Sequence, residues 1–174
     1  HGGAVNDSHK GFVNPNYGLV EAAVPIVNGD FESGTLSPWV AQSSGVAVES
    51  VYAHSGKYAL LIQGPSNTSS GYSNSAFQNI APNIPLPARI VGYMAVSLMP
   101  QNCGHPYNAF SIISSSGRVI EFGVGRAVGP NGVDGAFFDD NQNTFLIAPM
   151  AQGYMKFEVD IYSDHADFYV NDQK

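Results

Sequence analysis

Short stretches of alternating apolar and polar residues, each ended by turn-forming residues, constrain the fold of this chain more than any other feature. The clearest pair lies near the C-terminus, where apolar residues take the odd positions of 157–161 and the even positions of 166–170. Successive side chains of a strand point to opposite faces, so each stretch has one apolar face. The turn residues at 163–165 between them predict an antiparallel hairpin.

The same pattern recurs through the chain and predicts an all-β fold. Strands are expected at 46–51, 58–62, 75–80, 88–98, 109–113, 119–125, 135–138 and 144–147. Glycines and prolines, 19 and 11 in number, interrupt every candidate helix before its apolar stripe exceeds two turns. We therefore predict an antiparallel β-sandwich of the jelly-roll type over residues 26–174, preceded by an extended arm over residues 1–25.

Charge and hydropathy exclude several classes of partner. The chain of 174 residues carries 7 basic and 14 acidic residues, a net charge of −7, and therefore lacks the basic surface on which nucleic-acid binding depends. Its uninterrupted apolar runs are far shorter than the roughly 20 residues of a membrane helix. Nucleic acids and a membrane span are therefore not expected.

Three short motifs in the first third of the chain carry a family resemblance. They are Val-Asn-Gly-Asp-Phe-Glu-Ser-Gly at 27–34, Pro-Trp at 38–39 and Ala-His-Ser-Gly-Lys-Tyr-Ala-Leu at 53–60. In this order and spacing they resemble the opening of secreted carbohydrate-binding modules of the family four and nine type. The resemblance implies a galactose-binding-like β-sandwich without catalytic activity. The stretches 154–162 and 167–172 are similar instead to the late strands of concanavalin-like jelly rolls, which are also sugar-binding sandwiches.

The resemblance also implies a structural calcium ion, with Asp30 and Glu32 as ligands and backbone carbonyls around residues 56–57 completing the set. Calcium prefers six to eight oxygen ligands, which a turn with two carboxylates beside a glycine turn can provide. A third acidic ligand would come from Asp167 or Asp172. The alternative interpretation is that Asp30 and Glu32 are solvated turn residues.

Sugar recognition on a sandwich needs aromatic rings that stack on pyranose faces, with polar groups beside them. The one tryptophan, Trp39, is expected in the core, which leaves the tyrosines. The last hairpin places a group of suitable side chains on its polar face. These candidate carbohydrate-binding residues are Asp160, Tyr162, Tyr169 and Asn171, and Tyr72, Tyr93 and Tyr107 are further tyrosines available for contact.

The sequence offers little support for an enzyme. Glu158 and Asp160 resemble the paired carboxylates of a jelly-roll glycoside hydrolase strand, but Tyr162 and Ser163 stand where the second glutamate is needed. The polar outer face of a sandwich strand is therefore the preferred interpretation of this segment. An N-terminal copper site would need a second rigid histidine, and His9 lies in the arm. We expect no catalysis.

Several features favour an exported protein. The chain begins at His1 without an apolar leader, as expected of a mature form after leader removal or of a piece of a longer protein. It also carries glycosylation sequons at Asn6 and Asn67. Its one cysteine, Cys103, cannot form an internal disulfide. We expect a secreted or cell-surface glycoprotein.

Two functions remain open at this stage. The first is a non-catalytic extracellular module that binds a polysaccharide or glycan. The second is a structural subunit of an extracellular filament or surface layer, in which the apolar segment 17–24 of the arm completes the sheet of another copy by strand addition.

Overall fold

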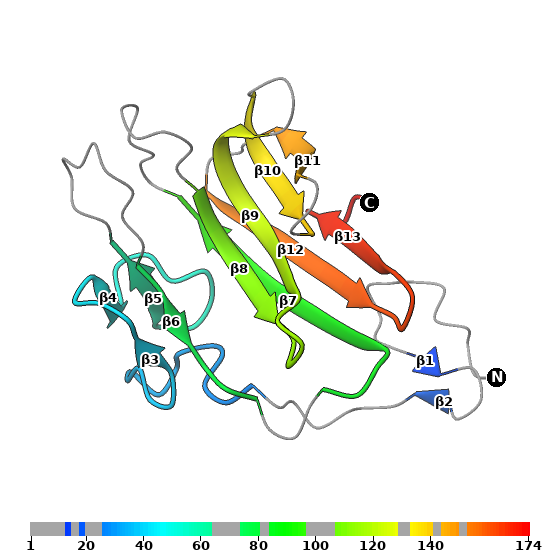
Figure 1. Ribbon diagram of the computed structural model, residues 1–174. Coiled ribbons are helices and arrows are strands. Elements are labelled where there is room, and N and C mark those ends of the chain that lie inside the picture. Colours follow the sequence, from blue (N-terminus) through cyan, green and yellow to red (C-terminus); the bar gives the residue numbers. More distant parts are fainter. Residues whose placement is uncertain are drawn as a thin grey trace.

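The chain is built of β-strands. The computed structural model describes residues 13–14, 18–19, 26–63, 74–80, 84–96, 107–128, 133–140, 144–149 and 153–174, and these residues contain thirteen strands and no helix (Figure 1). Accordingly, within those ranges there is no helix long and apolar enough to cross a membrane. The strand pairs in the described residues are antiparallel, which confirms the predicted all-β, antiparallel sandwich.

Two sheets form the body of the molecule. The larger has the strands β8 (Tyr107–Ile113), β9 (Val119–Val128), β10 (Val133–Asp139) and β11 (Thr144–Pro149), which are neighbours in chain order. The smaller has β12 (Tyr154–Ile161) at its centre, with β7 (Ala88–Ala95) and β13 (Ala166–Val170) on either side. The predicted final hairpin is thus confirmed, and β7, which precedes it by about 60 residues, completes its sheet.

The core lies between these two sheets. Met155, Phe157 and Val159 on the apolar face of β12 pack with Phe122 and Val124 of β9, and all five are buried. The rings of Phe122 and Phe157 lie 6.3 Å apart between centroids. Because successive side chains of β12 point to opposite faces, only its odd-numbered residues face the larger sheet.

A glycine in β7 lets the two sheets approach. Gly92 lies opposite Phe157 in the β7–β12 register, and the ring of Phe110 from β8 stands over it. A Cβ atom at position 92 would come within 2.6 Å of Phe110 Cζ. A side chain here would therefore force the aromatic layer apart.

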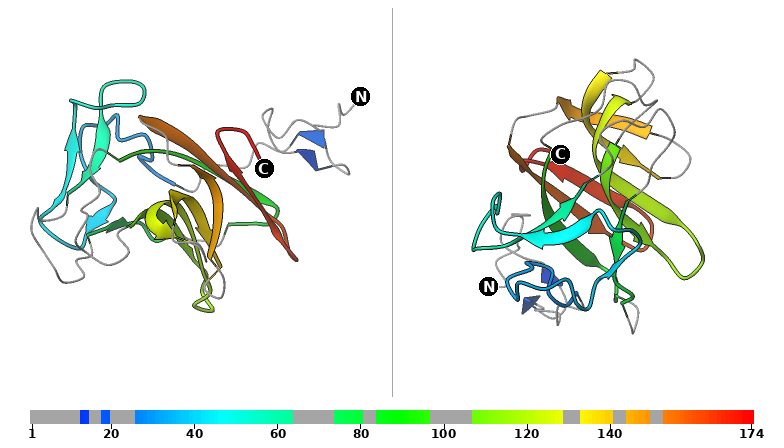
Figure 2. Two further views of the ribbon diagram at one scale, coloured as in Figure 1. Left: turned by 90° about the horizontal axis from the view of Figure 1, so that it is seen from above. Right: turned by 90° about the vertical axis from the view of Figure 1, so that its left-hand side faces the viewer.

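The first third of the chain forms short, separate hairpins. They are β1 (Val13–Asn14) with β2 (Gly18–Leu19), β3 (Val40–Ala41) with β6 (Ala76–Phe77), and β4 (Val46–Glu49) with β5 (Ala59–Ile62). In Figure 2 the β4–β5 hairpin lies at one end of the molecule and the β1–β2 hairpin at the other. Each residue of 26–63 is half-buried or exposed, so this segment covers the sandwich and does not build its core.

One expectation about the sheet faces was wrong. Glu158 and Asp160 were expected on an exposed polar face of the last hairpin, but their exposed fractions are only 3% and 2%. They do point away from the apolar core, as the alternation requires. They are nevertheless buried because charged side chains of the same face close over them, as described below.

Candidate functional site

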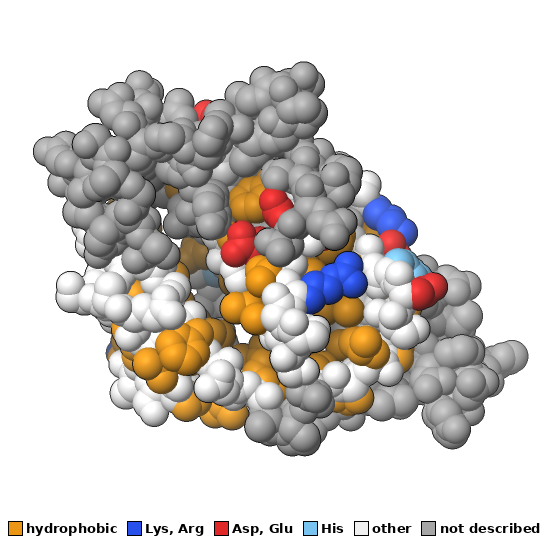
Figure 3. Space-filling view, viewed as in Figure 1, with side chains coloured by type: hydrophobic (Ala, Val, Ile, Leu, Met, Phe, Trp, Pro, Cys, Tyr) orange, Lys and Arg blue, Asp and Glu red, His pale blue; other side chains and the backbone are white. Residues whose placement is uncertain are grey.

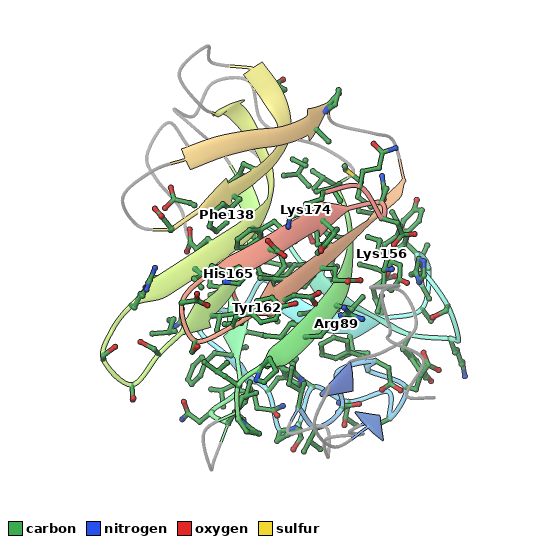
Figure 4. The ribbon with its side chains drawn as sticks, turned by 90° about the vertical axis from the view of Figure 1, so that its right-hand side faces the viewer. Arg89, Phe138, Lys156, Tyr162, His165 and Lys174 are labelled. Atoms are coloured by element: carbon green, nitrogen blue, oxygen red, sulfur yellow. The ribbon has the colours of Figure 1, made fainter. Side chains whose placement is uncertain are left out.

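The face of the smaller sheet that points away from the core carries most of the predicted site residues. We call it the outer face, and it consists of the side chains of Arg89, Val91, Tyr93, Tyr154, Lys156, Glu158, Asp160, Tyr162, Asp167 and Tyr169. Figure 4 shows this sheet from the front, with Arg89, Lys156 and Tyr162 labelled. Alternation along three neighbouring strands places these residues on one side.

Arg89 and Asp160 form the centre of the outer face. They are direct neighbours in the β7–β12 register, and Arg89 Nε and Nη2 donate to Asp160 Oδ1 and Oδ2 at 2.6 Å and 2.7 Å. This two-pronged geometry is the strongest form of an arginine–carboxylate pair. The hydrogen bond that Arg89 donates to Asp160 is the main reason why the pKa of Arg89 is raised. The pair fixes both side chains against the sheet.

Glu158 lies close to two cations of the outer face, Arg89 and Lys156. Arg89 Nε lies 3.2 Å from Glu158 Oε1, and Lys156 Nζ lies 3.4 Å from Oε2. Because the Nε–H of Arg89 is directed at Asp160, Oε1 is a buried oxygen without a hydrogen-bond donor among the described residues. Lys156 Nζ also bonds Asp172 Oδ1 at 2.5 Å, which is the first cause of its raised pKa. The carboxylates of Glu158, Asp160 and Asp172 are thus compensated by the cations of Arg89 and Lys156 on the same sheet.

Two of the predicted tyrosines lie beside these charges: Tyr169 is the register partner of Glu158, and Tyr162 directly follows β12. Tyr162 and Tyr169 are half-buried, and burial is the first cause of the raised pKa of each phenol. The nearby carboxylates of Asp160 and Asp167 raise the pKa of Tyr162 further. Both hydroxyls therefore stay protonated at neutral pH and can donate hydrogen bonds.

Asn171 has a different place. It ends β13 with a φ of 48°, its N–H donates to the Lys156 carbonyl, and its Oδ1 accepts from the Lys156 N–H at 2.9 Å. Its side chain therefore extends the ladder of the hairpin. On β12 Lys156 is six residues from Tyr162, or roughly 20 Å at about 3.3 Å per residue. Asn171 therefore lies far from Tyr162, although it follows Tyr169 by only two residues.

An aromatic cluster at the other end of the outer face was not predicted. The ring of His54 stacks on Tyr93 with centroids 3.8 Å apart and an angle of 19°, and it meets the edge of Tyr154 at 5.0 Å. The Tyr154 hydroxyl donates to the carbonyl of Tyr52. Tyr52 and Tyr93 remain 74% and 44% exposed. Nothing local in the sequence could have indicated the cluster, since it joins residues about 40 and 100 positions apart.

The predicted calcium ligands are engaged otherwise. Glu32 accepts hydrogen bonds from the N–H of Lys57 and of Tyr58 at 2.9 Å, and Asp30 Oδ1 accepts from the N–H of Glu32 at 3.2 Å. Gly56, with a φ of 68°, lets Glu32 approach, because a Cβ there would lie 2.5 Å from the carboxylate. No group of three or more His, Cys, Asp or Glu side chains in the described segments is arranged so that it could hold a metal ion. Backbone N–H donors occupy these carboxylates, and such surroundings do not fit a calcium ion, which needs oxygen ligands. Calcium at Asp30 and Glu32 is therefore a prediction that rests on the family resemblance alone.

Other predicted residues have structural surroundings or lie elsewhere. Trp39 is half-buried, packs on Phe31 at 5.7 Å, and donates from its indole nitrogen to the carbonyl of Asn28. Asn6, Tyr72, Asn67, Cys103 and the histidines at positions 1 and 9 lie outside the described residues.

The visible surface is weakly charged. In Figure 3 the coloured part of the molecule shows few Lys, Arg, Asp and Glu side chains among apolar and uncharged polar ones. The large apolar side chains exposed in the described part of the chain include Tyr93 of the aromatic cluster, Val91 on the same face of β7, and Val51 and Tyr52, which are close to His54 in the chain. Such a patch beside polar groups is typical of a ligand-binding surface.

Comparison with known proteins agrees with the motifs at 27–60. No curated protein and no solved structure is significantly similar to the chain. Residues 25–83 match the sequence model of a protein family described as carbohydrate binding domain (CBM_4_9). This match contains His54 and the Glu32 turn, and it confirms the predicted resemblance of this part of the chain to carbohydrate-binding modules of the family four and nine type.

Proposed function

We propose that this protein is a non-catalytic, extracellular carbohydrate-binding module and that its outer face holds the glycan. The family match over residues 25–83 supports carbohydrate binding. The observation that carries the choice of face is the His54–Tyr93–Tyr154 cluster, because there the family-matched segment contributes an aromatic ring directly to the outer face.

The chemistry of this face suits a sugar chain. The exposed rings of Tyr52 and Tyr93 offer apolar surfaces on which the C–H face of a pyranose can stack. Lys156, Arg89 and the phenols of Tyr162 and Tyr169 provide hydrogen-bonding groups along the same sheet. Their mutual ion pairs hold these groups in place before a ligand arrives, which reduces the entropy cost of binding.

The same ion pairs argue for binding without catalysis. A retaining glycosidase needs two carboxyl groups on either side of the bond that is cut, one of them free to act as an acid. Asp160 is tied to Arg89 through both oxygens, and Glu158 lies between Arg89 and Lys156. Both carboxylates are also buried. Neither one is presented to a substrate as an acid or a nucleophile.

Affinity gel electrophoresis against a panel of soluble plant, microbial and host polysaccharides tests the proposal. We expect at least one polysaccharide to retard the protein, and we expect Tyr93→Ala to weaken this retardation about tenfold through the loss of one stacking ring. Leu61→Ala, which removes an exposed side chain from β5, is the matched control. Retardation by none of the polysaccharides, or release of reducing ends from any of them, contradicts the proposal.

A further inference from the structure

A surface hollow of about 170 Å³ lies at the end of the outer face where β7 begins and β12 ends. Its walls are Leu86, Pro87, Tyr162, Ser163 and Asp164. Ala88 and Ile161 are the last paired residues of these two strands, so Pro87 and Tyr162 stand where the paired chains separate. The hollow is therefore continuous with the outer face through Tyr162.

The lining of the hollow combines apolar and polar groups. Leu86 is 51% exposed and, together with the ring of Pro87 and the ring of Tyr162, presents carbon atoms. The turn adds two polar residues to the lining, Ser163 and Asp164, and the side chain of Asp164 is 80% exposed. Small-molecule sites commonly have this composition, with apolar walls and a few polar groups that fix the orientation of the ligand.

Contacts within the turn 162–165 hold Tyr162 and Asp164 in place. The Tyr162 ring stacks on His165 with centroids 4.5 Å apart at 13°, and the Tyr162 N–H donates to the His165 carbonyl. His165 Nδ1 lies 2.8 Å from Asp164 Oδ1. Figure 4 shows Tyr162 and His165 next to each other at the turn between β12 and β13. Three of the side chains at this turn therefore support one another.

We propose that the hollow binds a single pyranose ring of the glycan, with Leu86 and Pro87 against its C–H groups and Tyr162 and Asp164 bonded to its hydroxyls. This inference rests on the proposed function and adds a defined subsite to it. The size agrees, because an apolar cavity of about 150 Å³ holds one benzene ring. A hollow of this volume therefore has room for one six-membered ring.

Titration of the folded protein with methyl pyranosides of glucose, galactose, mannose and xylose, followed by amide chemical shifts in NMR, tests the subsite. We expect one of these sugars to shift the amides of Tyr162, Ser163 and Asp164. Tyr162→Ala is expected to weaken binding about tenfold, and Tyr162→Phe about threefold because only the hydroxyl is lost.

Two exposed positions keep the test independent of folding. Leu86→Ala and Asp164→Ala change only the rim of the hollow, and each is expected to weaken the bound pyranoside at least threefold. Leu61→Ala on β5, which is also exposed, is the control for Leu86→Ala and leaves the affinity unchanged.

The outcomes separate this inference from the proposed function. If a polysaccharide binds and Tyr93→Ala weakens it, but no pyranoside shifts the turn amides, the subsite is wrong and the glycan-binding face stands. Binding of indole or benzyl alcohol without any pyranoside also overturns the subsite. If no polysaccharide and no pyranoside binds, both ideas fail together.

Discussion

At the residue scale, Arg89 is the side chain on which the order of the outer face depends most. It is the cation nearest to both Asp160 and Glu158, whose exposed fractions are 2% and 3%. Arg89→Leu leaves both carboxylates buried without this partner. We expect it to lower the free energy of unfolding by about 3 kcal/mol, measured by urea denaturation.

The control for this variant is Arg118→Leu, because Arg118 is exposed and lies in the turn between β8 and β9. Its effect should stay within about 0.5 kcal/mol. The double variant Arg89→Leu with Asp160→Leu removes both partners and should recover part of the lost stability, since the buried charge disappears with its cation. Equal losses for Arg89→Leu and Arg118→Leu would contradict the importance of the buried pair.

Glu32 is the second residue whose role can be measured directly. Its carboxylate holds the backbone N–H groups of Lys57 and Tyr58, and Gly56 makes the close approach feasible. We expect Glu32→Ala to lower the free energy of unfolding by about 1 kcal/mol. Because N–H groups surround this carboxylate, we expect neither calcium nor a chelator to shift the melting temperature.

Differential scanning fluorimetry with calcium and with EDTA provides the measurement for the Glu32 turn. A rise of several degrees in calcium that Glu32→Ala abolishes would show that the calcium implied by the family resemblance binds here after all.

At the scale of the elements, the contact between β7 and β8 depends on Gly92. A Cβ on this residue would meet the ring of Phe110 at 2.6 Å. We expect Gly92→Ala to destabilise the protein by about 1–3 kcal/mol, because overpacking forces neighbouring side chains out of their rotamers. Thermal unfolding followed by circular dichroism measures the effect. In the double variant Gly92→Ala with Phe110→Leu the clash is relieved, so a strictly additive loss would disprove this explanation.

The individual strands also show which signals a sequence contains. β12 and β13 were predicted from alternation because eight and five residues are enough to show a period of two. β3 has two residues, Val40 and Ala41, and its pairing with Ala76 and Phe77 is too short to leave a periodic pattern. β6 lies within the strand predicted at 75–80, whereas β3 forms where tertiary contacts bring it beside β6, and local sequence did not indicate it.

At the scale of the whole molecule, the two functions that the sequence left open differ in what they require of residues 1–24. In the described part of this arm, β1 and β2 pair with each other. We expect a chain without residues 1–24 to keep its polysaccharide affinity within about twofold of the intact chain, because the outer face is built from residues after position 50.

The filament hypothesis makes the opposite forecast for the same deletion. If the intact chain forms polymers that are visible by electron microscopy and the shortened chain forms none, strand addition through the arm is the function. The polysaccharide affinity of the shortened chain is measured in parallel, so that a general loss of folding is recognised.

The sequence by itself determined that the chain is an antiparallel β-sandwich, because side-chain alternation and turn residues are local properties of each strand. It also determined the carbohydrate-binding resemblance, since each of the three motifs at 27–60 is a short uninterrupted segment of sequence. Only the tertiary structure decided that Arg89 meets Asp160, which is 71 positions away, and that His54 stacks on Tyr93. These contacts depend on which strands become neighbours and on their register, and no short segment of sequence contains that information.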